Sequence, residues 1–70
     1  MRLTRNKNFA TLFDTTYTAM VAAERAIVKL PDIDKCHCAT HRRKVPSHEG
    51  FGWIVVARSQ GQDLGYLIYD

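Results

Sequence analysis

The segment FGWIVVARSQGQDLGYLIY, residues 51–69, is the starting point for predicting the fold. Its two halves, 51–58 and 64–69, are rich in β-branched and aromatic residues, and the dipeptide Gln60-Gly61 lies between them. Two such runs on either side of a short turn predict a β-hairpin. This hairpin is the clearest element in the chain, and the other elements are placed around it.

A turn centred on Gln60-Gly61 sets the register of the hairpin and gives it two apolar faces. The cross-strand pairs that it predicts are Arg58 with Asp63, Val55 with Tyr66, and Trp53 with Ile68. The first face then carries Phe51, Trp53, Val55, Ala57, Leu64, Tyr66 and Ile68. The second face carries Ile54, Val56, Leu67 and Tyr69.

Residues 8–29 are expected to form an amphipathic helix. Its apolar stripe repeats at the period of a helix and consists of Phe9, Leu12, Phe13, Thr16, Met20, Ala23 and Ile27. Asn8 is suited to cap the start, and Pro31 disfavours helical geometry at Leu30, which sets the end. The β-prone run 14–18 opposes a helix, so tertiary packing would have to override it.

The remaining segments complete a small α+β domain over residues 1–70. Residues 35–45 are expected to supply a third strand, and residues 46–50 a connecting loop. Residues 1–7 are expected to be a basic N-terminal arm. The predicted architecture is αβββ in two layers, one helix packed on a three-stranded antiparallel meander.

Length and cysteine content limit the class of protein. A chain of 70 residues has a small core and little room for an enclosed substrate pocket. Its two cysteines, Cys36 and Cys38, are fewer than a small secreted domain normally uses, which favours a reducing, cytoplasmic location. The longest apolar runs, Ala19–Ala23 and Trp53–Ala57, are too short to span a membrane.

The set Cys36, Cys38, His41 and His48 has the donor chemistry that zinc prefers. Its spacing, C-x-C-x2-H-x6-H, differs from that of a zinc finger. If Cys36 and His41 lie in one strand, the ligands converge only where that strand breaks. The alternative is a pair of structural thiols that behave as small apolar groups. We expect no metal and no cofactor, and zinc analysis would decide between the two.

The basic run Arg42-Arg43-Lys44 suits an acidic partner or phosphate groups. Trp53, Tyr66 and Tyr69 on a small sheet are of the type that stacks on bases. However, the net charge of +3 is small for a dedicated nucleic-acid domain. The basic run is therefore expected to be exposed and to contact a partner, with nucleic acid as the alternative.

Nothing in the sequence predicts catalysis. Ser47-His48-Glu49 has hydrolytic residue types, but adjacent residues cannot align as a triad does. No phosphate-binding glycine loop or metalloprotease motif is present. The chain is accordingly expected not to be an enzyme.

One helix covers only one face of a three-stranded sheet. The second face, with Ile54, Val56, Leu67 and Tyr69, is therefore expected to be uncovered and to bind a larger protein or a second copy of the chain. The alternative is that the N-terminal residues or the 35–50 segment fold over this second face. The function favoured by the sequence is a small protein-binding regulator or inhibitor, a size class that includes phage and mobile-element proteins. Nucleic-acid binding and a zinc module are the alternatives.

Overall fold

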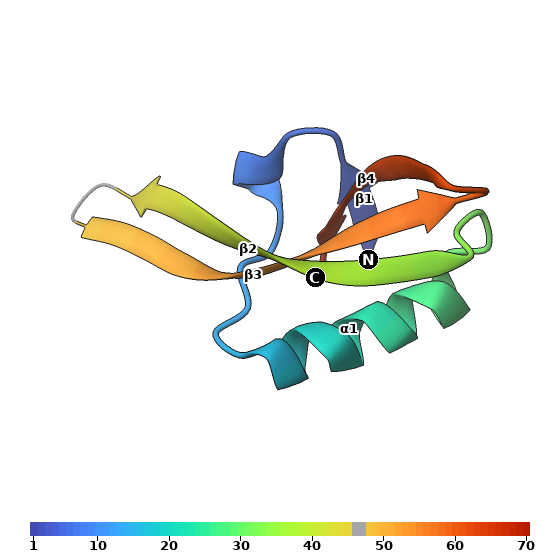
Figure 1. The fold of residues 1–70 in the computed structure, drawn as a ribbon, viewed down its shortest axis with the longest axis horizontal. Helices are drawn as coiled ribbons and strands as arrows, with labels where there is room; N and C mark the ends of the chain where they lie inside the picture. Colours follow the sequence, from blue (N-terminus) through green and yellow to red (C-terminus); the bar gives the residue numbers. More distant parts are fainter. Residues whose placement is uncertain (46–47) are drawn as a thin grey trace.

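The computed structural model describes residues 1–45 and 48–70. The elements in chain order are β1 (Arg2–Thr4), the 3-10 helix η1 (Lys7–Phe9), α1 (Thr16–Lys29), β2 (Lys35–Val45), β3 (His48–Ser59) and β4 (Gln62–Ile68). The strands form one four-stranded antiparallel sheet in the order β1-β4-β3-β2. In Figure 1, α1 lies against one face of this sheet and η1 lies over the other. The α+β class is confirmed, and the three-stranded sheet is wrong by one strand.

The additional strand is β1, in the segment expected to be a basic arm. It pairs with β4 over three positions, with Leu3 opposite Leu67 in the middle. The side chain of Leu3 packs against the core. Three residues are too few to show an alternating pattern, so the pairing depends on the neighbouring strand and not on local sequence.

The helix begins at Thr16, so the expected start at residue 8 is wrong. Thr15 caps α1, because its side-chain oxygen accepts a hydrogen bond from the backbone N–H of Thr18 at 3.1 Å. The β-prone run 14–18 therefore contains the helix start instead of lying within the helix. The expected end is confirmed: α1 stops at Lys29, and the N–H of Leu30 bonds the carbonyl of Ala26 at 2.9 Å.

Residues 11–13 are extended because they connect the two faces of the sheet. The pairing of β3 with β4 ends at Val56 and Tyr66, and the segment passes between the two strands beyond that point. The N–H of Thr11 bonds the carbonyl of Leu67 at 3.0 Å. Phe13 forms a bridge with Trp53. These backbone hydrogen bonds to the sheet replace the helical ones that the periodicity predicts.

The helix packs through alanine. Ala19, Ala22, Ala23 and Ala26 are its buried residues, and they lie over the fully buried side chains of Val55 and Leu67. Small side chains let the helix approach the sheet closely. The larger Met20 and Ile27, two members of the expected apolar stripe, stay 53% and 41% exposed.

The 51–69 hairpin has the expected turn. Gln60 and Gly61 both adopt positive φ, 51° and 81°, as a type I′ turn requires. The expected pairing of Arg58 with Asp63 is confirmed, and the two side chains form an ion pair at 2.9 Å.

Beyond that pair the register shifts between Ala57 and Arg58. Ala57 pairs with Gly65 and Val56 pairs with Tyr66, which leaves Leu64 as an extra residue in β4. An extra residue reverses the face of every later side chain in its strand. The predicted pairs Val55–Tyr66 and Trp53–Ile68 are therefore wrong, and Leu67 and Tyr69 move to the helix side.

The second face is not left uncovered. Ile54 and Val56 do lie on the face away from α1, but they are only 2% and 5% exposed. Lys7 of η1 lines the same small hollow as both of them, and Figure 1 shows η1 above this face. The expectation of an open apolar face is wrong, because the N-terminal residues fold over it.

β2 and β3 form a long hairpin that extends beyond the rest of the molecule (Figure 1). Their register runs without a shift from the Lys35–Arg58 pair to the Val45–His48 pair. The expected third strand over 35–45 is confirmed. The expected loop 46–50 is shorter than predicted, since β3 begins at His48, and residues 46 and 47 lie outside the described part of the chain.

Candidate functional site

A groove lies between α1 and β2. Its volume is about 360 Å³, at the lower end of the range for ligand pockets. The groove is lined by Thr16, Met20, Ala23, Glu24, Ile27, Cys36, His37, Cys38 and Trp53. We call this set the α1–β2 groove.

The alanine packing of α1 creates the groove. Because alanine holds the helix close over β3, the longer side chains of Met20 and Ile27 extend over the edge of the sheet at β2. They lie seven residues apart, two helical turns, and so share one side of the helix. The result is an apolar wall beside an edge strand, with Glu24 as its one acidic member.

Cys36 and Cys38 line the floor of the groove on the strand side. They are free thiols and half-buried. Burial raises the pKa of both thiols, and for Cys36 the neighbouring Cys38 raises it further. The thiols are therefore neutral at physiological pH and act as small apolar groups in this wall.

The open edge of the sheet runs along β2, because β2 is last in the strand order. Trp53 of β3 uses both its backbone N–H and its C=O for Phe13, so its partner Thr40 is in a non-hydrogen-bonded pair. Backbone groups alternate in an antiparallel ladder. Thr40 therefore directs its N–H and C=O toward the open edge. The other even-numbered residues of β2, such as Cys36 and Cys38, do the same.

The residues of the basic run of β2 differ in their exposure and contacts. Arg42 is exposed. Arg43 is half-buried, contrary to the expectation of exposure, and its Nη2 donates to the backbone carbonyls of Lys7, at 3.2 Å, and Ala10. Arg43 therefore fastens the N-terminal segment to β2. The side chain of Lys44 lies outside the described part, although its backbone continues the strand.

The apolar residues predicted to contact a partner lie in the core or at its edge. Ile54, Val56 and Leu67 are buried. Tyr69 is half-buried, its ring lies edge-on to Phe13, and its hydroxyl accepts from Arg25 at 2.6 Å.

Three of the four candidate metal ligands, Cys36, Cys38 and His41, do not converge. Cys36 and Cys38 lie on the helix face of β2, and His41 lies on the other face by the alternation of the strand. Among the described residues no group of three or more His, Cys, Asp or Glu side chains is placed to hold a metal ion. The side chains of His48 and Glu49, and all of Ser47, lie outside the described part.

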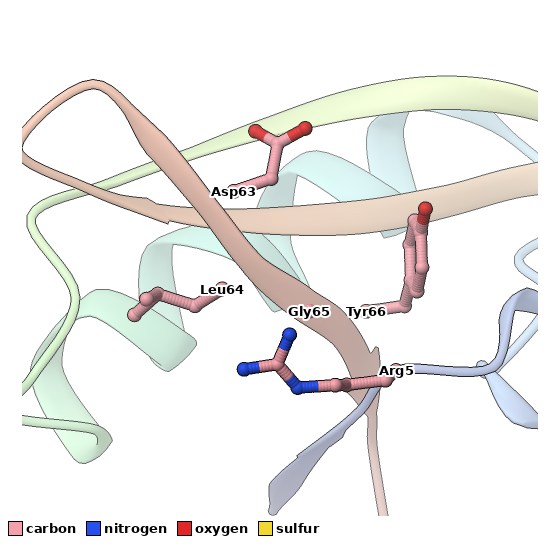
Figure 2. Close-up of a pocket in the computed structure, with 5 residues that line it drawn as sticks. All are labelled: Arg5, Asp63, Leu64, Gly65 and Tyr66. Carbon is pink, nitrogen blue, oxygen red and sulfur yellow. The ribbon is translucent and has the colours of Figure 1, made fainter.

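Two smaller hollows lie elsewhere. Figure 2 shows the first, of about 140 Å³, where the Asp63 carboxylate and the Arg5 guanidinium extend to opposite sides of the β4 ribbon. The second, of about 210 Å³, lies on the face away from α1 and includes His41, whose Nε2 has no hydrogen-bond partner among the described atoms. Both are below the volumes typical of ligand pockets.

The sequence does not predict the α1–β2 groove, because Met20 and Ile27 belong to an apolar stripe of the kind that normally faces the core. One signal does point to the observed packing: alanines at positions 19, 22, 23 and 26 follow the i, i+3, i+4, i+7 spacing of one helix side. Small residues lower the hydrophobicity of that stripe, so the larger neighbours dominate the pattern.

Comparison with protein-family models, with curated proteins and with solved structures finds no match for this chain. Among the described residues, no helix has the length and apolar character needed to cross a membrane.

Proposed function

We propose that this chain is a non-catalytic protein-binding module that holds a segment of a larger protein in the α1–β2 groove. The observation that supports the proposal is the exposure of Met20 and Ile27, at 53% and 41%, around a groove of about 360 Å³. Apolar side chains gathered around a hollow at the surface are typical of sites that bind another molecule. Regulation or inhibition of the larger protein would follow from occupying its segment.

Capture from a lysate of the source organism tests the proposal with matched variants. Ile27→Lys places a charge in the groove, and Val28→Lys places the same charge on the next residue, which is 82% exposed and does not line the groove. We expect the native chain and Val28→Lys to capture the same protein, and Ile27→Lys to capture at least about tenfold less, since a buried unpaired charge is costly. Equal capture by all three would contradict the proposal.

Nucleic-acid binding is the second candidate, and one relationship favours it. Arg42 is the cross-strand partner of Phe51, and the Phe51 ring is 62% exposed. A cation beside an exposed ring on a projecting hairpin is an arrangement that can contact a phosphate and stack on a base.

Salt separates the two candidates. Phosphate contacts weaken steeply as salt rises, whereas an apolar contact does not. For nucleic acid, Phe51→Ala would weaken binding of a single-stranded oligonucleotide and Ile27→Lys would leave it unchanged. If the groove is the binding site, Ile27→Lys would weaken protein capture and Phe51→Ala would leave it unchanged.

We also propose a reducing location, such as the cytoplasm. Cys36 and Cys38 are free thiols on one strand with a single residue between them, and no other cysteine is present to pair with either. A small domain in an oxidising compartment normally has its cysteines in disulfides.

A further inference from the structure

We infer that the α1–β2 groove takes its partner as an extended strand, which pairs antiparallel with the open edge of β2 and carries acidic residues beside the basic positions of that strand. The inference rests on the proposed function and specifies the mode of binding and the chemistry of the partner. Backbone pairing would supply affinity, and side chains entering the groove would supply specificity.

The backbone of β2 supports strand addition. Both backbone polar groups of Trp53 bond Phe13, at 2.7 and 2.8 Å. Thr40, which lies opposite Trp53, therefore directs its own N–H and C=O outward. Because the β2–β3 register has no shift, Cys36 and Cys38 do the same. The open edge therefore offers a continuous row of donors and acceptors at every second residue, as a further strand requires.

The same residues place the partner's side chains. In an antiparallel pair, residues directly opposite one another lie on the same face of the sheet. Partner residues opposite Cys36 and Cys38 therefore point toward α1 and enter the groove between those thiols and the side chains of Met20 and Ile27. Apolar residues fit at these alternate positions.

The basic residues of β2 favour acidic residues in the partner strand. β2 has the sequence KCHCATHRRKV, with four basic residues and no acidic one. Lys35, at the start of β2, and Arg42, near its other end, are exposed, and acidic residues opposite them would be favourable. Glu24 is the one carboxylate lining the groove, so acidic partner residues fit at the ends and apolar residues fit at the middle.

Charge disfavours a second copy of the chain in the pairing register that is centred on Ala39. Two antiparallel β2 strands centred on Ala39 would set Lys35 of one copy opposite Arg43 of the other. Like charges directly opposite each other destabilise a strand pair, and lysine on an edge strand is a known protection against such pairing.

The probe is the peptide Glu-Asp-Glu-Thr-Val-Thr-Val-Thr-Val-Glu, with both ends blocked. Aligned antiparallel with residues 44 to 35, it sets its valines opposite Thr40, Cys38 and Cys36, and its terminal glutamates opposite Lys44 and Lys35. Trp53 is the single tryptophan of the chain and lines the groove, so its fluorescence reports occupancy. We expect saturable binding with a Kd below about 1 mM.

Two methylated peptides isolate the backbone contribution. Methylating the three valine nitrogens removes the donors that face the carbonyls of β2. Methylating the three threonine nitrogens adds the same groups on the outer edge, where no β2 carbonyl lies. We expect the first change to weaken binding at least about tenfold and the second to change it less than about threefold. Equal effects of the two changes would overturn strand addition.

A variant of the protein gives an independent measurement. Thr40→Pro removes one outward N–H of β2, a change that an edge strand accepts, and Thr40→Val keeps that N–H. With both variants folded by circular dichroism, we expect peptide binding to be lost only in Thr40→Pro. If Thr40→Pro does not fold, the methylated peptides alone decide.

The outcomes separate the inference from the proposed function. Binding that is insensitive to valine methylation but lost in Ile27→Lys would overturn strand addition and leave the groove as a binding site. An absence of peptide binding up to about 1 mM would also overturn strand addition, while the lysate capture decides the groove separately. A doubling of the native mass at high concentration, lost in Thr40→Pro, would identify a second copy as the occupant and overturn the acidic partner.

Discussion

Phe13 and Trp53 exchange two backbone hydrogen bonds: the N–H of Phe13 bonds the Trp53 carbonyl at 2.7 Å, and the N–H of Trp53 bonds the Phe13 carbonyl at 2.8 Å. This bridge holds the N-terminal segment where it crosses from one face of the sheet to the other. It also determines which backbone groups of β2 are left at the open edge.

Gly52→Ala should disrupt this bridge. A Cβ atom at residue 52 would lie 2.5 Å from the Phe13 carbonyl oxygen, a distance that forces the crossing segment to move. We expect a loss of about 1–3 kcal/mol in the free energy of unfolding, measured by urea denaturation. Gly50→Ala is the matched control, because its nearest contact would be 3.3 Å and its cost should be smaller. A loss as large in the control would show that the Phe13 carbonyl is not the cause.

Arg43→Ala should destabilise the fold. Arg43 donates to the backbone carbonyls of Lys7 and Ala10, and hydrogen bonds from a charged donor contribute about 1.5–3 kcal/mol. Because Arg43 is only half-buried, we expect about 1–2 kcal/mol by thermal or urea denaturation. Lys35→Ala, an exposed residue of the same strand, should cost less than about 0.5 kcal/mol. Equal melting temperatures for the two variants would contradict this stabilising role, and Arg43 would then be interpreted as a residue that contacts a partner.

The turn should respond oppositely to two substitutions. Gly61 has a φ of 81° and nothing within 4 Å of an added Cβ, so Gly61→Ala should cost about 1–2 kcal/mol from backbone conformation alone. Gln60 has a φ of 51°, and asparagine adopts this region more readily than glutamine does. Gln60→Asn should therefore raise the melting temperature by a few degrees. A stabilising Gly61→Ala would contradict the type I′ geometry.

The thiols should make stability depend on alkaline pH. Burial holds the pKa of Cys36 and Cys38 above the ordinary value of 9.0, so the folded chain favours the neutral thiols. Their contribution is fully present below about pH 9 and is lost as pH rises through the raised pKa values of the folded state. The native chain should lose more stability between about pH 8 and pH 10.5 than Cys36→Ala/Cys38→Ala does, by urea denaturation. Parallel pH profiles would contradict this.

Local sequence is enough to predict the parts of the fold that depend on neighbouring residues. The Gln60-Gly61 turn, the Arg58–Asp63 pair beside it, the strand over 35–45 and the helix end before Pro31 all follow from local chemistry: backbone conformation at the turn, cross-strand charge, β-propensity and the proline ring. Each of these features requires only residues within a few positions of one another.

The remaining features depend on contacts between residues that are distant in the chain. Leu64 is an extra residue in β4 only because Gly65 and Tyr66 pair one position further along β3, and this shift moves Leu67 under the helix. The segment around Phe13 has helical periodicity, yet hydrogen bonds to Trp53 hold it extended. Met20 matches a core stripe, but alanine packing turns it outward. In each case the decisive energy is that of a backbone or packing contact between residues distant in the chain, which the local pattern does not contain.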